Sequence, residues 1–280
     1  MIRLIGIDID GTLLDSAGRM PDANRTAIQA AVAAGIHVTL VTGRSYPFAR
    51  PVLDSLPEPV TLIVSNGAVE RTREGRTLAR RLLDQDIARS VLDATEDHRA
   101  SAALIFDRDV AGQMVFENMD WSHPGRKAYW ARNQAFITQA VPLQAALTEN
   151  PIQVMFSGGA AVMRPLSDWI RREFLDVAVL LTEYVHRDFS LVDVTASTAT
   201  KGRALAWRAT ELGLTADEVM AIGDNFNDVD MLEFAGTPVV MGNAADALKD
   251  RGWHLAASND EAGLASAIAR FALDGRHSGA

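Results

Sequence analysis

Two aspartates that could hold a metal ion or a proton stand near the start of the chain, in the stretch GIDIDGTLLD. Asp8 and Asp10 are separated by one residue, follow an apolar run, and are succeeded by Gly11 and Thr12. Two carboxylates held close together in a partly buried site repel by about 4 kcal/mol at an effective dielectric constant of about 20. Such a pair therefore indicates a bound cation or a shifted proton. The dipeptide Asp10-Gly11 taken alone favours another interpretation, a type I′ hairpin turn.

A second acidic cluster, AIGDNFNDVD, follows another short apolar run. Asp224 and Asp228 lie four residues apart in it. The cluster fails the calcium-binding EF-hand pattern at three places, where Phe226, Val229 and Ala235 stand instead of an oxygen ligand, a glycine and a glutamate. Asp228 alone is equally well explained as a helix N-cap. Four carboxylates at two strand ends, however, are the oxygen ligands that suit Mg²⁺, which commonly keeps waters for a phosphate.

Three further residues could bind phosphate. Thr42 and Gly43 end a β-branched run and precede a predicted helix, and a hydroxyl beside a helix N-terminus is a reasonable phosphate donor. A strand-end threonine followed by a turn glycine is the structural alternative. Lys201 opens a helix, where a positive charge is mildly unfavourable, and lysine occurs at only two other positions. Its alternative is an ordinary solvated surface lysine.

The composition narrows the class of protein. The chain has 280 residues, a net charge of −9 and no cysteine, which excludes disulfides and thiolate metal sites. The acidic balance disfavours a nucleic-acid partner. No apolar stretch reaches the length of a membrane span and no signal peptide is recognisable, so we expect a cytoplasmic protein with no membrane partner. The six histidines are scattered and form no zinc-binding pattern.

The elements that must position these residues alternate in type. Strands are predicted at 2–7, 36–42 and 60–65, with helices at 23–34 and after residue 45, and a hairpin follows near residue 75. Helix and strand alternate again from 201 to 272. Such alternation predicts an α/β fold with a parallel sheet, in which ligands gather at the carboxyl ends of the strands. The middle, 84–186, holds two helical stretches and several strand candidates and is predicted to be an inserted α+β domain. Its aromatic-rich segment near Trp121 and Trp130 is assigned to the core of that domain in preference to a substrate surface.

Together these pieces resemble the haloacid dehalogenase-like hydrolase superfamily. Its four motifs occur in order as GIDIDGTLLD, LVTGR, Lys201-Gly202 and GDNFND. The stretches SNGA, VVMGNA and SNDEAGLASAI resemble the Cof-type branch, whose α+β cap is inserted between motifs two and three. The resemblance implies a Rossmann-like core at 1–83 and 187–280 and a substrate-selecting cap at 84–186.

The resemblance also implies a mechanism. Asp8 would attack phosphorus to give an aspartyl-phosphate, and Asp10 would act as general acid and then as general base. Mg²⁺ would be held by Asp8, the main chain of Asp10, Asp224 and, in support, Asp228. The phosphoryl group would meet Thr42, Gly43 and Lys201, with Asn66 and Arg44 near the same crevice. The expected reaction is Mg²⁺-dependent hydrolysis of a small phosphorylated metabolite such as a sugar phosphate.

Three other functions are open to a chain of this kind. A phosphomutase or a specialised sugar-phosphate phosphatase shares the same core residues. A dinucleotide oxidoreductase shares the α/β alternation, but Asp-x-Asp-Gly stands where G-x-G-x-x-G is required. A non-catalytic module that binds phosphorylated ligands would not need a carboxylate directed at phosphorus.

Overall fold

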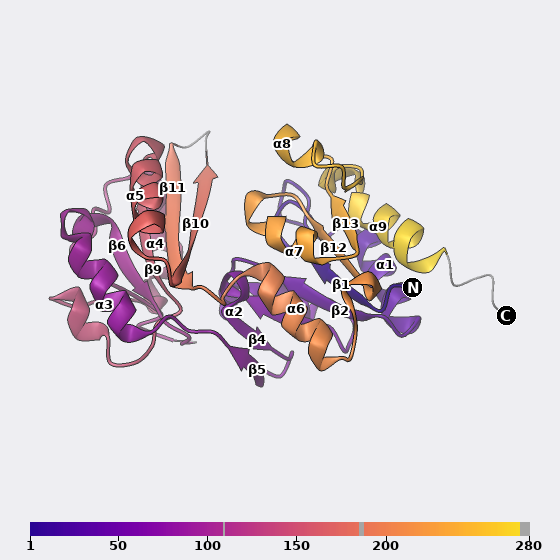
Figure 1. Cartoon of the computed structure of the whole chain (residues 1–280), viewed down its shortest axis with the longest axis horizontal. Helices are drawn as coiled ribbons and strands as arrows, with labels where there is room; N and C mark the ends of the chain where they lie inside the picture. The colour runs from indigo at the N-terminus through magenta and orange to yellow at the C-terminus, as the bar shows by residue number, and fades with distance from the viewer. Residues whose placement is uncertain (109, 185–187, 275–280) are drawn as a thin grey trace. The chain divides into compact units, whose positions relative to one another are not determined.

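A computed structural model describes residues 1–108, 110–184 and 188–274. The chain forms two compact units (Figure 1). The first unit combines Met1–Arg80 with Thr200–Ala280, and the second is Arg81–Ala199. The second unit is therefore inserted into the chain of the first. Each unit has its own sheet and its own hydrophobic core.

The first unit is built on an eight-stranded sheet in the order β14-β13-β12-β1-β2-β3-β4-β5. The strands are β1 (Leu4–Ile7), β2 (His37–Val41), β3 (Thr61–Val64), β4 (Val69–Arg71), β5 (Thr77–Arg80), β12 (Val219–Gly223), β13 (Thr237–Val240) and β14 (His254–Leu255). From β14 to β3 all neighbours run parallel, and β4 and β5 extend the sheet as an antiparallel hairpin. The predicted α/β fold with a parallel sheet is confirmed.

Strands β1, β3 and β12 are buried along their whole length. This burial indicates that helices cover both faces of the sheet. The helices are α1 (Asp22–Ala33), α2 (Tyr46–Asp54), α6 (Lys201–Glu211), α7 (Val229–Phe234), α8 (Asp246–Lys249) and α9 (Gly263–Ile268). Helix α1 packs against α9, and α6 packs against α7. Among the described residues, no helix is long and apolar enough to cross a membrane.

The hairpin interpretation of Asp10-Gly11 is wrong. Strand β1 has parallel partners on both sides, β12 and β2, so the chain leaves it without turning back on itself. Gly11 does bend the chain, with φ at +84°. A positive φ at this position is the part of the turn prediction that the structure keeps.

The second unit has a six-stranded, mainly antiparallel sheet in the order β10-β11-β9-β6-β7-β8. Its elements are α3 (Gln85–Ala94), β6 (Ala102–Ile105), β7 (Met114–Phe116), α4 (Pro124–Asn133), β8 (Ile137–Gln139), β9 (Gln153–Gly158), α5 (Ala160–Glu173), β10 (Val177–Tyr184) and β11 (Phe189–Ala196). Helices α3 and α5 pack on the sheet around a core that contains Leu92, Phe156 and Ile170. The mixed α+β composition expected for the middle of the chain is present.

The division between the units falls later in the chain than residue 187. Residues Phe189–Ala196 form β11, which pairs antiparallel with both β10 and β9 and so belongs to the second sheet. Strand β8 and helix α4 were not predicted as elements. Strand β8 has only three residues, and its pairing partner β7 is distant in the sequence, so the local pattern carries little signal.

The aromatic side chains of the second unit form a cluster of their own. The ring centroids of Trp121 and Trp130 lie 4.8 Å apart, and the ring of Phe116 packs edge-on against both. This group packs against the buried side chains of Met114 and Met119. Their assignment to the core of the inserted domain is therefore confirmed.

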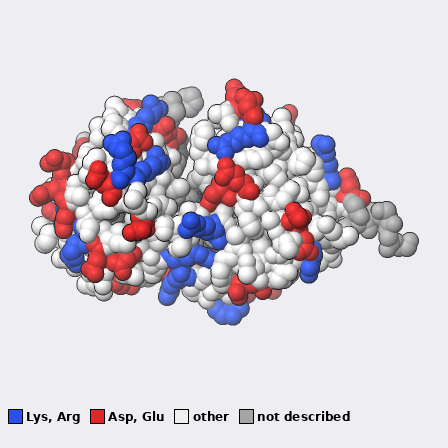
Figure 2. Space-filling view, viewed as in Figure 1, with Lys and Arg blue, Asp and Glu red and all other residues white. Residues whose placement is uncertain are grey.

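Elsewhere on both units, acidic and basic side chains occur in small separate groups on the face shown in Figure 2.

One buried acid should make the stability of the second unit depend on pH. Asp193 on β11 is 6% exposed and accepts a hydrogen bond from Gln153 Nε2 at 2.7 Å. Burial raises the pKa of Asp193 to about 7. Because the folded-state pKa lies above the unfolded value, the folded protein is favoured at low pH, and this contribution is lost as the pH rises towards 7.

We expect Asp193→Asn to raise the unfolding temperature by several degrees at pH 8 and by much less at pH 5. The amide avoids burying a charge and still offers an oxygen to Gln153. Thermal unfolding at the two pH values measures this difference. Asp168→Asn, which neutralises an exposed acid on α5, is the control and should show no comparable pH dependence. An equal shift at both pH values would contradict the buried-charge explanation.

Candidate active site

The two acidic motifs meet because their strands are neighbours. Strands β1 and β12 pair in parallel with Ile7 opposite Ile222, so the residues that follow them leave the sheet at the same edge. Asp8 follows β1 directly, and Asp224 follows β12 directly. Both acidic residues therefore lie at the carboxyl ends of neighbouring parallel strands, which is where ligands bind in open α/β sheets.

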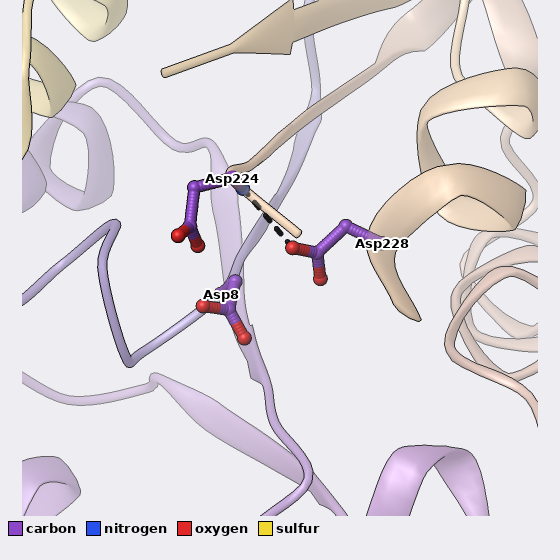
Figure 3. A group of neighbouring side chains, drawn as sticks. All are labelled: Asp8, Asp224 and Asp228. Atoms are coloured by element: carbon purple, nitrogen blue, oxygen red, sulfur yellow. Dashed lines mark hydrogen bonds between the residues drawn. The ribbon is translucent and has the colours of Figure 1, made fainter. Parts of the chain in front are cut away.

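Three carboxylates converge at this edge. Asp8, Asp224 and Asp228 each offer one oxygen, and these oxygens all lie within 4.8 Å of one another. Figure 3 shows the three side chains directed towards a common space from two segments of the chain. Asp8 and Asp228 are 5% and 0% exposed, and Asp224 is half-buried. The separation is too small for three carboxylate charges to coexist there without a counter-charge.

Lys201 supplies part of that counter-charge. Its Nζ lies 2.7 Å from Asp8 Oδ1 and 2.6 Å from Asp228 Oδ1, and the side chain is 1% exposed. The side chain of Thr200 caps the N-terminus of α6, and Lys201 is the first residue of that helix. The surface-lysine interpretation is therefore wrong. Burying an ammonium group in this way is favourable only when anions surround it.

Asp228 stands at the N-cap position of α7, but its side chain makes no capping hydrogen bond to that helix and instead closes the capping box that begins at Asn225. Its Oδ2 accepts hydrogen bonds from the backbone N–H groups of Asp224 and Asn225, both at 3.0 Å. Its Oδ1 accepts a hydrogen bond from Lys201, so the residue belongs to the acidic cluster and is not the N-cap of α7 through its side chain. The residue fixes the loop that carries Asp224 while it contributes charge to the cluster.

Burial and mutual repulsion perturb the acids of the cluster. Burial raises the pKa of Asp8 well above its ordinary value, against the opposing attraction of Lys201, and the charges of Asp228 and Asp224 raise it further. Burial, followed by the charge of Asp228, raises the pKa of Asp224 to about 7. Burial alone would lower the pKa of Lys201, but the carboxylates of Asp228 and Asp8 outweigh it and raise the pKa. The lysine therefore stays charged at neutral pH.

The side chain of Asp10 lies apart from the three converging carboxylates. Arg44 Nη2 donates to Asp10 Oδ1 at 2.6 Å and Arg44 Nε donates to Oδ2 at 2.8 Å, which makes a two-point ion pair. The Asp10 side chain is 60% exposed. Placing Asp10 at the metal through its main chain stays a prediction. Arg44, predicted only to lie near the crevice, contacts the proposed acid/base residue directly.

The predicted phosphate-binding residues other than Lys201 lie in two connected loops, which follow β2 and β3. Thr42 is 1% exposed, and its Oγ1 accepts the backbone N–H of Arg44 at 3.1 Å, which leaves the hydroxyl proton for another acceptor. Asn66 has φ at +53°, and its N–H donates to Thr42 O at 3.0 Å. A Cβ at Gly43 would lie 3.0 Å from Asn66 Oδ1, so a larger residue there would crowd the asparagine. The segments after β2 and β3 are thus held together.

Two polar residues that the sequence analysis gave no role also contact the acidic cluster. Thr12 Oγ1 donates to Asp224 Oδ1 at 3.1 Å. Asn243 Nδ2 donates to Gly11 O at 2.9 Å and reaches Asp224 Oδ2 at 3.4 Å. Thr12 lies in the first acidic motif and Asn243 in the VVMGNA stretch. Neither residue type by its position alone predicts a contact with the acidic cluster.

The acidic cluster has the donor set of a site for a hard divalent cation. Its oxygens are close enough to share one ion, and its three carboxylates exceed the single positive charge of Lys201 by two when all are ionised. Oxygen ligands with this excess of negative charge fit Mg²⁺. The residues present therefore fit the predicted metal.

The chain resembles known proteins along almost its whole length. It matches the family described as haloacid dehalogenase-like hydrolase over residues 5–268. It is 30% identical to 5-amino-6-(5-phospho-D-ribitylamino)uracil phosphatase YwtE of Bacillus subtilis, with 94% of this chain and 96% of that protein covered. It is 27% identical to phosphatase YwpJ of the same organism, over 94% of this chain and 98% of that protein.

The fold is also similar to a solved structure. A haloacid dehalogenase-like hydrolase from Bacteroides thetaiotaomicron superposes with a TM-score of 0.78 at 24% identity, covering 96% of this chain and 99% of that one. At this identity the likeness shows the fold alone. The family match over nearly the whole chain confirms the resemblance found in the motifs. The chain belongs to the haloacid dehalogenase-like hydrolase family and is a hydrolase whose curated relatives include phosphatases.

Proposed function

We propose that this protein is a Mg²⁺-dependent phosphatase that hydrolyses a small phosphorylated metabolite through an aspartyl-phosphate on Asp8. The observation that carries the proposal is the position of Asp8. It is a buried carboxylate that shares one space with Asp224, Asp228 and Lys201 at the carboxyl end of the sheet. A nucleophile, a cation site and a fixed positive charge are the parts that phosphoryl transfer requires.

In the first step, an oxygen of Asp8 attacks phosphorus. Lys201 engages Asp8 Oδ1, which leaves the second oxygen to form the new bond. The bond between phosphorus and the leaving oxygen breaks, and that oxygen takes a proton from Asp10. In the second step, Asp10 removes a proton from water, the resulting hydroxide attacks phosphorus, and Asp8 is released with inorganic phosphate.

The metal would be held by Asp8, Asp224 and Asp228, whose oxygens already converge. When bound, Mg²⁺ supplies positive charge that stabilises the negative charge on the phosphoryl oxygens. We assign Lys201 and the hydroxyl of Thr42 to the same phosphoryl oxygens. Both are buried, so they would act in a medium where charge interactions are strong.

The acid/base role assigned to Asp10 requires its ion pair with Arg44 to open. Both oxygens of Asp10 are engaged by the guanidinium group. A phosphate is a competing anion for Arg44, because a guanidinium group binds carboxylate and phosphate with the same two-point geometry. We therefore assign Arg44 to the incoming phosphate, whose binding would release Asp10 for proton transfer.

The substrate class rests on the relatives and on the inserted unit. YwtE is named for a phosphorylated ribityl compound, which is a small phosphomonoester. We assign substrate selection to the second unit, in keeping with the family resemblance, and take that compound and common sugar phosphates as the first substrates to test. Free phosphate is the expected product. Transfer of phosphate within the substrate would instead indicate a mutase.

Removal of divalent metal tests the proposal directly. We expect EDTA to abolish hydrolysis of p-nitrophenyl phosphate and added Mg²⁺ to restore it. Metal binding must displace protons from the cluster, because the pKa of Asp224 is raised to about 7 in the metal-free protein. The Mg²⁺ concentration that gives half-maximal activity should therefore rise as the pH falls from 8 to 6. Turnover that persists undiminished in EDTA would contradict the proposed function.

A further inference from the structure

Asn243 links three segments at the carboxyl edge of the first sheet. It lies three residues beyond the end of β13, the strand next to β12 in the sheet. Its Nδ2 donates to Gly11 O at 2.9 Å and to Asp224 Oδ2 at 3.4 Å. Its Oδ1 accepts the backbone N–H of Asn259 at 3.0 Å. One amide side chain thus touches the loops that follow β1 and β12 and the segment that begins at Asn259.

The carboxylate of Asp224 is held from both of its oxygens. Thr12, which is fully buried, donates to Oδ1 at 3.1 Å, and Asn243 donates to Oδ2. Oδ2 also lies against the backbone of Gly11, where an added Cβ would come within 2.3 Å of it. Two donors on opposite oxygens fix the plane of a carboxylate, and the metal-facing direction of Asp224 is fixed with it.

Asn243 is held in place by Asn259, which is itself fixed by hydrogen bonds. Asn259 is 5% exposed, and its Nδ2 donates to Leu14 O at 2.9 Å. Asp260 accepts the backbone N–H of Ser16 at 2.8 Å. The segment that orients Asn243 is thereby bound to the loop that leads away from Asp8 and Asp10. The orientation of the amide is consequently set by two backbone groups, the carbonyl of Gly11 and the N–H of Asn259.

We propose that Asn243 is a positioning residue that orients Asp224 for metal binding. The inference rests on the proposed function, because it presumes a divalent cation at the acidic cluster. The amide adds no charge to the cluster, so its contribution is geometric. It keeps Asp224 Oδ2 beside Gly11, and it binds the carbonyl of the residue that follows Asp10.

Removing Asn243 should weaken metal binding more than it weakens the fold. Outer partners of metal ligands typically contribute about 10- to 100-fold in metal affinity or activity. The contact to Asp224 is long at 3.4 Å, so we expect the lower end, about tenfold. The side chain is exposed, and its loss should change the unfolding temperature in EDTA only slightly.

The experiment compares Asn243→Ala with the wild type and with Asn150→Ala in the full chain. Asn150 is also an exposed asparagine that accepts a backbone N–H, but it lies in the second unit. Mn²⁺ titrated by electron paramagnetic resonance gives the metal affinity without substrate, and Mg²⁺ titrations of p-nitrophenyl phosphate hydrolysis give the functional dependence. We expect about tenfold weaker Mn²⁺ and Mg²⁺ binding for Asn243→Ala, with most of kcat recovered at saturating Mg²⁺. Asn150→Ala should match the wild type.

The outcomes separate this inference from the proposed function. A wild type that neither binds Mn²⁺ nor needs Mg²⁺ would overturn both. A Mg²⁺-dependent wild type with unchanged metal affinity in Asn243→Ala would overturn the positioning role alone, as would a loss of kcat at saturating Mg²⁺ with unchanged affinity. If Asn243→Ala does not fold, Asn243→Ser, which also lacks the reach to Asp224, replaces it and carries the same expectations.

Discussion

Replacing Asp8 by asparagine is expected to abolish turnover of p-nitrophenyl phosphate, by at least about four orders of magnitude. The amide nitrogen cannot form the aspartyl-phosphate, and among the described residues no other carboxylate lies between Lys201 and the end of β1. After rapid acid quench of the wild type, a phosphoryl group should be found by mass spectrometry on the peptide that contains Asp8. The variant should show none.

The same substitution should leave the fold intact. Burial raises the pKa of Asp8, so its negative charge is unfavourable in the metal-free protein at neutral pH, and asparagine removes that charge without changing the shape. We expect the variant to unfold in EDTA at a temperature no lower than that of the wild type. Asp54→Asn, which neutralises an exposed acid on α2, is the control for loss of a carboxylate and should retain activity. Full activity in Asp8→Asn would refute the nucleophile assignment.

Replacing Lys201 by methionine is expected to damage stability and catalysis together. The substitution leaves Asp8 and Asp228 buried without the cation that lies within 2.7 Å of each. Breaking a buried ion pair by removing one partner costs about 3–5 kcal/mol. Loss of a fixed positive charge at the phosphoryl group should also lower kcat about 100-fold or more. Urea unfolding in EDTA and steady-state hydrolysis measure the two effects.

Two comparisons sharpen the lysine experiment. Lys249 lies 2.8 Å from Asp246, but that aspartate is 90% exposed, so Lys249→Met should change stability little. Added Mg²⁺ should recover part of the stability lost in Lys201→Met, because a divalent cation can neutralise the same carboxylates. A Lys201→Met protein as stable as Lys249→Met in EDTA would show that the buried cluster does not depend on the lysine.

The core of the first unit could be predicted from the sequence, because the patterns that indicate its strands are local. Apolar runs such as that ending at Ile7 predict buried parallel strands, and each acidic motif follows such a run directly. Parallel strands bring their carboxyl ends to one edge, so the meeting of Asp8 with Asp224 followed from the pattern. The hairpin interpretation of Asp10-Gly11 failed because strand pairing is decided by distant neighbours, which a dipeptide cannot report.

The contacts that refine the site were less accessible to sequence reasoning. The pairing of Asp10 with Arg44 depends on how two loops after neighbouring strands face each other, and both residue types are common on surfaces. Asn243 carries no charge and acts over a span of 232 residues, so its spacing from Gly11 contains no periodic signal. Side-chain direction, which tertiary packing sets, separates such residues from ordinary loop asparagines.

The neighbouring positions of β1 and β12 also have a consequence for how the protein is made. Asp8 is synthesised early. Thr12 and Asp224, which are hydrogen-bonded to each other in the folded protein, are 212 residues apart in the sequence. Contacts this distant form only after a long segment of chain has been closed, and they depend on strands that appear late in synthesis. The whole second unit is translated before β12 exists. The acidic cluster can therefore assemble only late, because a chain that ends before β12 contains Asp8 but neither Asp224 nor Asp228.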